Sequence, residues 1–303
     1  PLLFTILISD ISQVIKNGKY HLYADDTQLY YRCKVENISD TILKINSDLD
    51  KVSDFSLRNC LKLNHDKSNY IIIGSRQNLQ KLSTKYIPPV KLADTPIERK
   101  NNVKNLGIIF DDTLSWTKHL NTSIGKAYGK FKQTYRFKNF LSEKSKLNIS
   151  ETYILSQFNY CDSLFLNASQ TLKNKVQKVQ NSCLRFSLNL RKFDHITTHR
   201  KRLGYLDMDQ RRILHSVTLM HKITKGIAPC YLQNRIKRHS DIHAYNTRNR
   251  LGLAVDRNTS AKKSNAFFGS IPKKLNEFSN NMDISHLSID TLKIKYKTFL
   301  LNS

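Results

Sequence analysis

The first 75 residues change from a helical to an extended hydrophobic pattern and back. Leu3, Leu7 and Ile11 recur at helical spacing, which predicts a buried helix over residues 2–17 that Gly18 closes in a left-handed conformation. Residues 19–31 hold two short aromatic and apolar runs on either side of an acidic pair. That arrangement predicts a β-hairpin with the acids at its tip.

The pattern then predicts a helix, further strands and a long polar segment. Apolar residues recur every three or four positions over 38–55, as in an amphipathic helix. Residues 61–64 and 70–73 are expected as strands on the sheet that carries the hairpin. Residues 76–102 are expected as a loop with one or two short strands, and residues 103–110 as one further strand.

After Trp116 the pattern is helical. It predicts helices over residues 120–135, 147–158 and 172–186, and a fourth that begins after Asp207 and ends before Gly226. The rest of the chain is basic, polar and weakly periodic. The fold class expected is therefore α+β, with a mixed N-terminal part and an all-α remainder.

Charge is distributed unevenly along the 303 residues, whose net charge is +26. Residues 1–75 carry nine basic and nine acidic side chains, so the whole excess lies in the remainder. A neutral start and a basic remainder favour a polyanion partner such as nucleic acid. Solvated helix faces in a lysine-rich chain would give the same composition, and both interpretations stay open.

Apolar runs and cysteines narrow the class of protein. No run of about 18 apolar residues occurs, so we expect no membrane partner. The five cysteines are scattered and form no CxxC, which favours a reducing compartment over a disulfide framework. Cys183, His195 and His199 offer too few ligands for a zinc site.

Asp25-Asp26 is the segment with the clearest chemistry. Adjacent carboxylates repel each other unless a cation neutralises them, and Mg²⁺ prefers oxygen ligands. Phosphoryl transfer commonly uses two such ions. Aspartate is also a common turn residue, so a purely structural turn is the alternative.

Several segments, in order, resemble the reverse transcriptases of non-LTR, LINE-type retrotransposons. Residues 1–11 resemble the end of the helix motif that precedes the catalytic hairpin, and Tyr23-Ala-Asp-Asp26 resembles the metal-binding motif itself. Residues 61–68 resemble a strand that leads to a lysine, and residues 103–119 resemble the segment that enters the thumb. Residues 244–250 resemble the YNTR stretch near the C-terminus of such proteins.

The resemblance implies a right-hand polymerase cut within its catalytic domain. Residues 1–115 would be a truncated palm, residues 116–190 a helical thumb and residues 191–303 a basic helical extension. The implied activity is RNA-directed DNA synthesis, in which deoxynucleotides extend a DNA primer on an RNA template with Mg²⁺. The implied location is the nucleus or the cytoplasm, and the oligomeric state is left unassigned.

The resemblance also implies roles for single residues. Asp25 and Asp26 would bind Mg²⁺, Tyr23 would lie near the primer terminus, and Leu106-Gly107 would belong to the primer-gripping hairpin. Lys67 would protonate or orient the leaving pyrophosphate, or be only a solvated lysine beside a strand. The basic clusters expected to contact nucleic acid are Lys126, Lys130 and Lys132, and Arg200, Lys201 and Arg202.

Other residues are expected to be structural, and one ligand is expected to lie elsewhere. Trp116 and His119 are expected to pack at the junction of palm and thumb, and Asp111-Asp112 to form a turn. His215 and His221 are expected to pack or face solvent. The family's third carboxylate would precede Pro1, so we expect a fragment that is inactive alone. The alternative is a non-catalytic nucleic-acid-binding remnant of a decayed or host-retained element.

Overall fold

The computed structural model describes residues 2–242, 245, 250, 252–255, 260–279, 284 and 286–302. The chain forms two compact units, Pro1–Lys118 and His119–Ser303. Most of the 244–250 stretch lies outside the described residues. In the described part, no helix is both long and apolar enough to cross a membrane.

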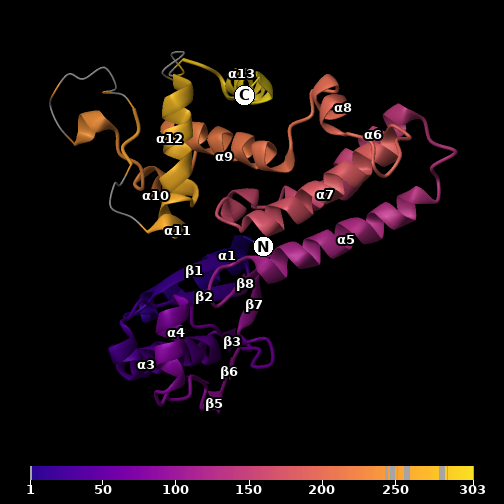
Figure 1. Ribbon diagram of the computed structural model, residues 1–303. Helices are drawn as coiled ribbons and strands as arrows, with labels where there is room; N and C mark the ends of the chain where they lie inside the picture. The colour runs from indigo at the N-terminus through magenta and orange to yellow at the C-terminus, as the bar shows by residue number, and fades with distance from the viewer. Residues whose placement is uncertain are drawn as a thin grey trace. The chain divides into compact units, whose positions relative to one another are not determined.

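The first unit combines helices with short strand pairs (Figure 1). Its helices are α1 (Leu2–Ser9), α2 (Ile11–Val14), α3 (Ile38–Arg58) and α4 (Arg76–Ser83). Its strands are β1 (Lys19–Tyr23), β2 (Asp26–Tyr30), β3 (Asn69–Tyr70), β4 (Lys91–Leu92), β5 (Thr95–Pro96), β6 (Glu98–Arg99), β7 (Asn102–Asn105) and β8 (Ile108–Asp111). The predicted helix over 38–55 is confirmed as α3.

The predicted acidic hairpin is confirmed. Strands β1 and β2 pair antiparallel, with Lys19 opposite Tyr30 and Tyr23 opposite Asp26. The prediction that residues 61–64 and 70–73 belong to its sheet is wrong, because β1 and β2 form a two-stranded sheet of their own. The carbonyl of Asn64 accepts the N–H of Ser68, which folds residues 64–68 into a turn. Only Asn69–Tyr70 is a strand in this region, and it pairs parallel with β6.

The single strand predicted over residues 103–110 is in fact a second hairpin. Leu106 and Gly107 have φ of 44° and 84°, so the chain reverses there and β7 pairs antiparallel with β8. Positive φ at both central residues is the geometry of a tight two-residue hairpin turn. The residues predicted as a loop over 76–102 include helix α4, because the Ser75 hydroxyl caps its N-terminus by accepting the Asn78 N–H.

The helix predicted over residues 2–17 is interrupted, and the role predicted for Gly18 is wrong. A turn at Asp10 separates α1 from α2. Gly18 does not have positive φ. A side-chain carbon at Gly18 would overlap the ring of Tyr31, so close approach explains the glycine better than helix termination does.

Asp48 of α3 ties both ends of the acidic hairpin to the helix. Its side chain is fully buried and accepts the backbone N–H groups of Lys16, Asn17 and Gly18 at 3.2, 2.8 and 3.0 Å. The Asn17 amide and the Tyr31 hydroxyl donate to the same carboxylate, each at 2.9 Å. Residues 16–18 precede β1 and Tyr31 follows β2, so one carboxylate fixes the base of the hairpin.

These hydrogen bonds also keep Asp48 ionised. Burial alone would raise the pKa of the carboxyl group, but the donated hydrogen bonds outweigh it and hold the pKa below its usual value. A buried carboxylate is tolerated here because donors occupy both of its oxygens.

The second unit is helical. Its elements include α5 (Thr117–Tyr135), α6 (Glu143–Ile149), α7 (Gln170–Ser187), α8 (Thr197–Arg202), α9 (Met208–Thr224), α10 (Cys230–Gln233), α11 (Ala261–Ser264), α12 (Phe267–Ser279) and α13 (Ile289–Asn302). After α6 the chain continues as a π-helical turn over Ser150–Ile154 and a 3-10 turn over Leu155–Phe158. The helices predicted over 120–135 and 172–186 are confirmed as α5 and α7.

Helix α9 begins and ends as the sequence predicts. The Asp207 carboxylate accepts the Gln210 N–H in a capping box, and Gly226 has φ of 73° just after the end of the helix. Its buried face packs with α12 and α13 in one apolar core that includes Met220, Ile271 and Leu292. Because that core also contains Leu166, the expected boundary at residue 190 falls inside this unit.

We expect Asp48→Asn to lower the free energy of unfolding by about 3 kcal/mol, because an amide presents a donor to several backbone donors and leaves them unsatisfied. Exposed Asp50 on the same helix supplies the control Asp50→Asn, which should change stability by less than about 0.5 kcal/mol. Urea unfolding of the full chain measures both.

The effect of Asp48→Asn should depend on pH. The folded state lowers the pKa of Asp48 below the unfolded value of about 3.9. The carboxylate therefore contributes fully above that pH, and its contribution is lost as the pH falls through the lowered pKa. The stability gap between wild type and Asp48→Asn should narrow in acid. A gap that stays constant from pH 7 to pH 3 would contradict this account.

Candidate metal and nucleic-acid site

The tip of the acidic hairpin is a tight turn at Ala24-Asp25. Tyr23 lies opposite Asp26 at the ends of the two strands, and Tyr23 is 65% exposed. Ala24 has φ of 51°, a left-handed conformation that costs a non-glycine residue about 1–2 kcal/mol. Backbone strain of this kind concentrates at functional sites, where the surrounding structure holds it.

Asp25 and Asp26 differ from the buried aspartates of the same unit in having no partners. Both are exposed, and within residues 2–242 neither carboxylate accepts a side-chain hydrogen bond or forms an ion pair. Asp48, by contrast, is saturated with donors. The hairpin tip therefore presents two adjacent carboxylates whose oxygens remain available to a cation.

Asp111 is a second saturated carboxylate. It is buried and accepts the backbone N–H groups of Thr113, Ser115 and Trp116. Burial alone would raise its pKa, but these hydrogen bonds and those from the Thr113 and Ser115 hydroxyls hold the pKa below the usual value. The prediction that Asp111-Asp112 is structural is confirmed for Asp111, which organises the turn before α5.

The second hairpin is attached to the first. The Gln28 amide nitrogen on β2 donates to the Asn105 side-chain oxygen on β7 at 2.7 Å. Asn105 immediately precedes the turn at Leu106-Gly107, and Leu106 is 38% exposed. The structure thus brings the Asp25-Asp26 hairpin and the Leu106-Gly107 hairpin together in one unit (Figure 1).

Lys67 lies in the turn over residues 65–67, and its side chain is exposed. Its backbone N–H donates to the Asn64 side chain at 3.0 Å, and its carbonyl accepts the Asn69 amide at 2.9 Å. In the described part of the chain, its ammonium forms no ion pair with Asp25 or Asp26. Both interpretations of Lys67 therefore stand as predictions.

The cluster on α5 is divided between structure and solvent. Lys126 and Lys132 are exposed. Lys130 instead donates to the Tyr153 carbonyl at 3.1 Å, with its ammonium 4.3 Å from the centre of that ring. Lys126 and Lys132 are the members of this cluster whose charges face solvent.

The cluster on α8 is divided in the same way. The Arg200 guanidinium donates to the Tyr205 carbonyl and to the Gln210 side chain beside the N-terminus of α9. Lys201 and Arg202 are exposed. Arg200 thus helps to hold α8 against α9, and its two neighbours face solvent.

Trp116 and His119 both pack against aromatic rings. Trp116 is buried and packs edge-to-face with Phe110 within the first unit, with ring centres 5.6 Å apart. His119 stacks on Phe165 at 4.9 Å within the second unit, where burial and the charge of Lys126 lower its pKa. Their packing role is confirmed, and their place at a palm–thumb junction stays a prediction.

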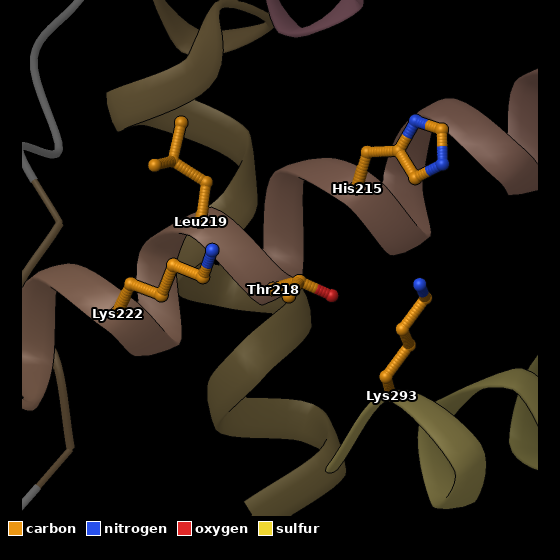
Figure 2. A pocket seen from close by; sticks show the side chains of 5 residues that line it. All are labelled: His215, Thr218, Leu219, Lys222 and Lys293. Carbon is orange, nitrogen blue, oxygen red and sulfur yellow. The ribbon is translucent and has the colours of Figure 1, made fainter. Parts of the chain in front are cut away.

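A small hollow lies between α9 and α13, lined by His215, Thr218, Leu219, Lys222 and Lys293 (Figure 2). Its volume is about 180 Å³, below the range of about 300–1,000 Å³ usual for cofactor sites. His215 Nδ1 lies 2.6 Å from the buried Asp162 carboxylate. His221 is buried with Nε2 3.1 Å from the Leu287 carbonyl, and burial lowers its pKa. Buried His221 thus has the expected packing role, whereas half-buried His215 is held by Asp162 and lines the hollow.

The sequence did not reveal Asp48, Gln28 or Asn105 as important residues. A signal for Asp48 was present, because it lies three residues after Ile45 and four before Val52, on the apolar face of α3. A carboxylate in that position needs buried donors. Gln28 and Asn105 are 77 residues apart, and no local pattern connects them.

Asp25 and Asp26 are the candidate metal ligands that the sequence predicts in the first unit. Among the residues that the structure describes, no group of three or more His, Cys, Asp or Glu side chains is placed to hold a metal ion. Asp25 and Asp26 fit one side of a Mg²⁺ site by the chemistry of their oxygens and by their lack of competing partners.

The chain is similar to a probable RNA-directed DNA polymerase from transposon X-element of Drosophila melanogaster. The two sequences are 25% identical over 280 residues, which is 88% of this chain and 27% of that relative. No protein-family model and no solved structure matches the chain. The resemblance to a retrotransposon reverse transcriptase is confirmed as a distant sequence similarity over most of this chain.

Proposed function

We propose that this chain is part of an RNA-directed DNA polymerase of a non-LTR retrotransposon and supplies its pair of metal-binding aspartates. The observation that carries the proposal is the contrast among the aspartates of the first unit. Asp48 and Asp111 are buried and saturated with donors, whereas Asp25 and Asp26 are exposed on a strained hairpin tip. The distant polymerase relative favours phosphoryl transfer over other metal chemistry.

In this proposal the hairpin positions the reacting groups. Asp25 and Asp26 would hold Mg²⁺, and Tyr23 would contact the primer terminus beside them. When bound, the metal lowers the pKa of the primer 3′-hydroxyl and neutralises charge on the phosphoryl group. The hydrogen bond between Gln28 and Asn105 would keep Leu106-Gly107 at a fixed distance from the carboxylates, so that a primer held there meets them.

The basic second unit would bind the template and primer. Its exposed cations include Lys126, Lys132, Lys201 and Arg202. Lysine and arginine bind the phosphate backbone largely without regard to base sequence. The names palm and thumb for the two units are part of this proposal.

A second candidate function is nucleic-acid binding without catalysis. It is favoured by the ligand set, because no third carboxylate joins Asp25 and Asp26 in the described part of the chain. The two candidate functions predict different results when this chain is joined to the remaining domains of a related polymerase.

We expect the 303-residue chain alone to incorporate no deoxynucleotides on a primed RNA template, because two carboxylates without a third ligand hold the metal weakly. A primer-extension assay with Mg²⁺ measures this. Incorporation above background that disappears in Asp25→Asn would contradict the expectation.

The catalytic proposal is tested by a chimera in which this chain replaces the matched segment of the Drosophila relative. We expect the chimera to extend a primer on RNA and Asp25→Asn to reduce extension by at least about 100-fold, since metal stabilisation of the transition state amounts to several kcal/mol. The control Asp112→Asn alters the second acidic pair and should retain extension. Extension that is undiminished by Asp25→Asn would favour the non-catalytic candidate.

Binding of template and primer should depend strongly on salt. For about 6–10 phosphate contacts, the affinity of the full chain for an RNA–DNA hybrid should fall about 10³–10⁵-fold between 50 and 200 mM salt. The double variant Lys126→Ala, Lys132→Ala should reduce the slope of log affinity against log salt by about 2, which corresponds to the loss of about two phosphate contacts. Exposed Lys34 and Lys62 in the first unit supply the matched control. A flat salt dependence in fluorescence anisotropy would rule out the nucleic-acid partner.

A further inference from the structure

Three phenylalanines of the second unit project into solvent from two loops. Phe137 and Phe140 lie between α5 and α6 and are 58% and 86% exposed, and Phe193 lies between α7 and α8 and is 86% exposed. Phenylalanine is normally buried, so an exposed group of such rings indicates a binding surface more often than chance.

The two loops begin at the same end of the helices α5, α6 and α7, which pack against one another. The ring of Tyr135 at the end of α5 lies 5.7 Å from the ring of Phe186 at the end of α7. The Lys146 ammonium of α6 donates at 3.0 Å to the side chain of Asn189, where the second loop begins. In Figure 1 the turn from α5 to α6 and the exit from α7 lie toward the same side of this unit.

Cations are interleaved with these rings. Arg136 and Lys138 flank Phe137, and Arg191 and Lys192 precede Phe193. Arg136, Arg191 and Lys192 are exposed, and the Lys192 ammonium lies 5.5 Å from the centre of the Phe193 ring.

Asp194 lies in the same loop as Arg191 and Lys192. Within the second loop, the carboxylate of Asp194 accepts the Arg191 backbone N–H at 2.7 Å, and so fixes the loop. The guanidinium and ammonium groups of Arg191 and Lys192 form no ion pair in the described part of the chain.

Alternating rings and cations match one type of partner best. A single nucleic-acid strand presents bases and phosphates in alternation, and aromatic side chains stack on unpaired bases of any sequence. A duplex keeps its bases stacked internally and offers only phosphates and groove edges to such loops. The strongly positive chain favours a polyanion over a neutral protein partner.

We propose that Phe137, Phe140 and Phe193 form a platform on which unpaired nucleotides stack, with Arg136, Arg191 and Lys192 holding their phosphates. The proposal rests on the proposed nucleic-acid partner and adds that this end of the second unit takes single-stranded RNA or DNA. In a polymerase this platform would hold template or product outside the paired region.

The test measures anisotropy of the full chain with a labelled 20-nucleotide uridine RNA and with a 20-base-pair RNA–DNA hybrid at 100 mM salt. Phe140→Leu with Phe193→Leu keeps the surface apolar but removes both rings. Single-strand affinity should fall about tenfold for each ring that stacks on a base, and hybrid affinity should change less than about twofold. The salt slope should stay unchanged, since the cations remain.

Two controls sharpen the comparison. Phe140→Trp with Phe193→Trp keeps flat rings and should retain single-strand binding, whereas Tyr86→Ala removes an exposed ring of the first unit (79% exposed) and should have no effect. Because the substituted side chains are exposed, the thermal unfolding midpoints should match that of the wild type.

The outcomes separate this proposal from the proposed function. If the leucine variant binds the single strand as well as the wild type does, the platform is wrong, while salt-dependent hybrid binding still supports the polymerase assignment. If neither nucleic acid binds, both proposals fail. Binding to vesicles of phosphatidylserine and phosphatidylcholine that needs the rings, without ring-dependent RNA binding, would identify a membrane surface and overturn the platform.

Discussion

The carboxylate of Asp48 is the contact on which the candidate site depends. A two-stranded hairpin is at best marginally stable in water by itself. Here α3 holds it at its base, because Asp48 accepts hydrogen bonds from the backbone before β1 and from Tyr31 after β2. Gly18 permits this closure, since any larger residue would meet the Tyr31 ring. The tip of the hairpin can then carry a strained turn at Ala24.

The aspartates of the first unit occur in two opposite environments. Asp48 and Asp111 lose contact with water and gain enough donors to remain ionised with lowered pKa values. Asp25 and Asp26 keep their exposure and have no protein donors within residues 2–242, which leaves their oxygens to a cation. The Gln28–Asn105 hydrogen bond connects the hairpin that carries Asp25 and Asp26 to the hairpin that turns at Leu106-Gly107. In the proposed function, chemistry at the tip and stability at the base therefore depend on different aspartates.

Local patterns in the sequence predicted the acidic hairpin, α3, α5, α7 and the capping box of α9, because each follows from periodicity or from neighbouring polar residues. The same patterns predicted one strand where β7 and β8 form a hairpin. Leucine rarely adopts positive φ, so the residue type at position 106 does not indicate the turn there. The prediction of a strand over residues 61–64 was wrong, because the chain forms a turn that begins at Asn64. Asp48 and the Gln28–Asn105 contact depend on tertiary packing, which no local pattern encodes. The exposure of Phe140 and Phe193 likewise emerged only from the fold.

The central claim is that Asp25 and Asp26 together bind a divalent cation, and Mn²⁺ binding followed by electron paramagnetic resonance tests it most directly. Titration of the full chain should show bound Mn²⁺ that Mg²⁺ displaces. Binding should be lost in Asp25→Asn and in Asp26→Asn but retained in Asp112→Asn, which removes a carboxylate from the other adjacent pair. Mn²⁺ binding that is equal in the wild type and in Asp25→Asn would contradict the claim.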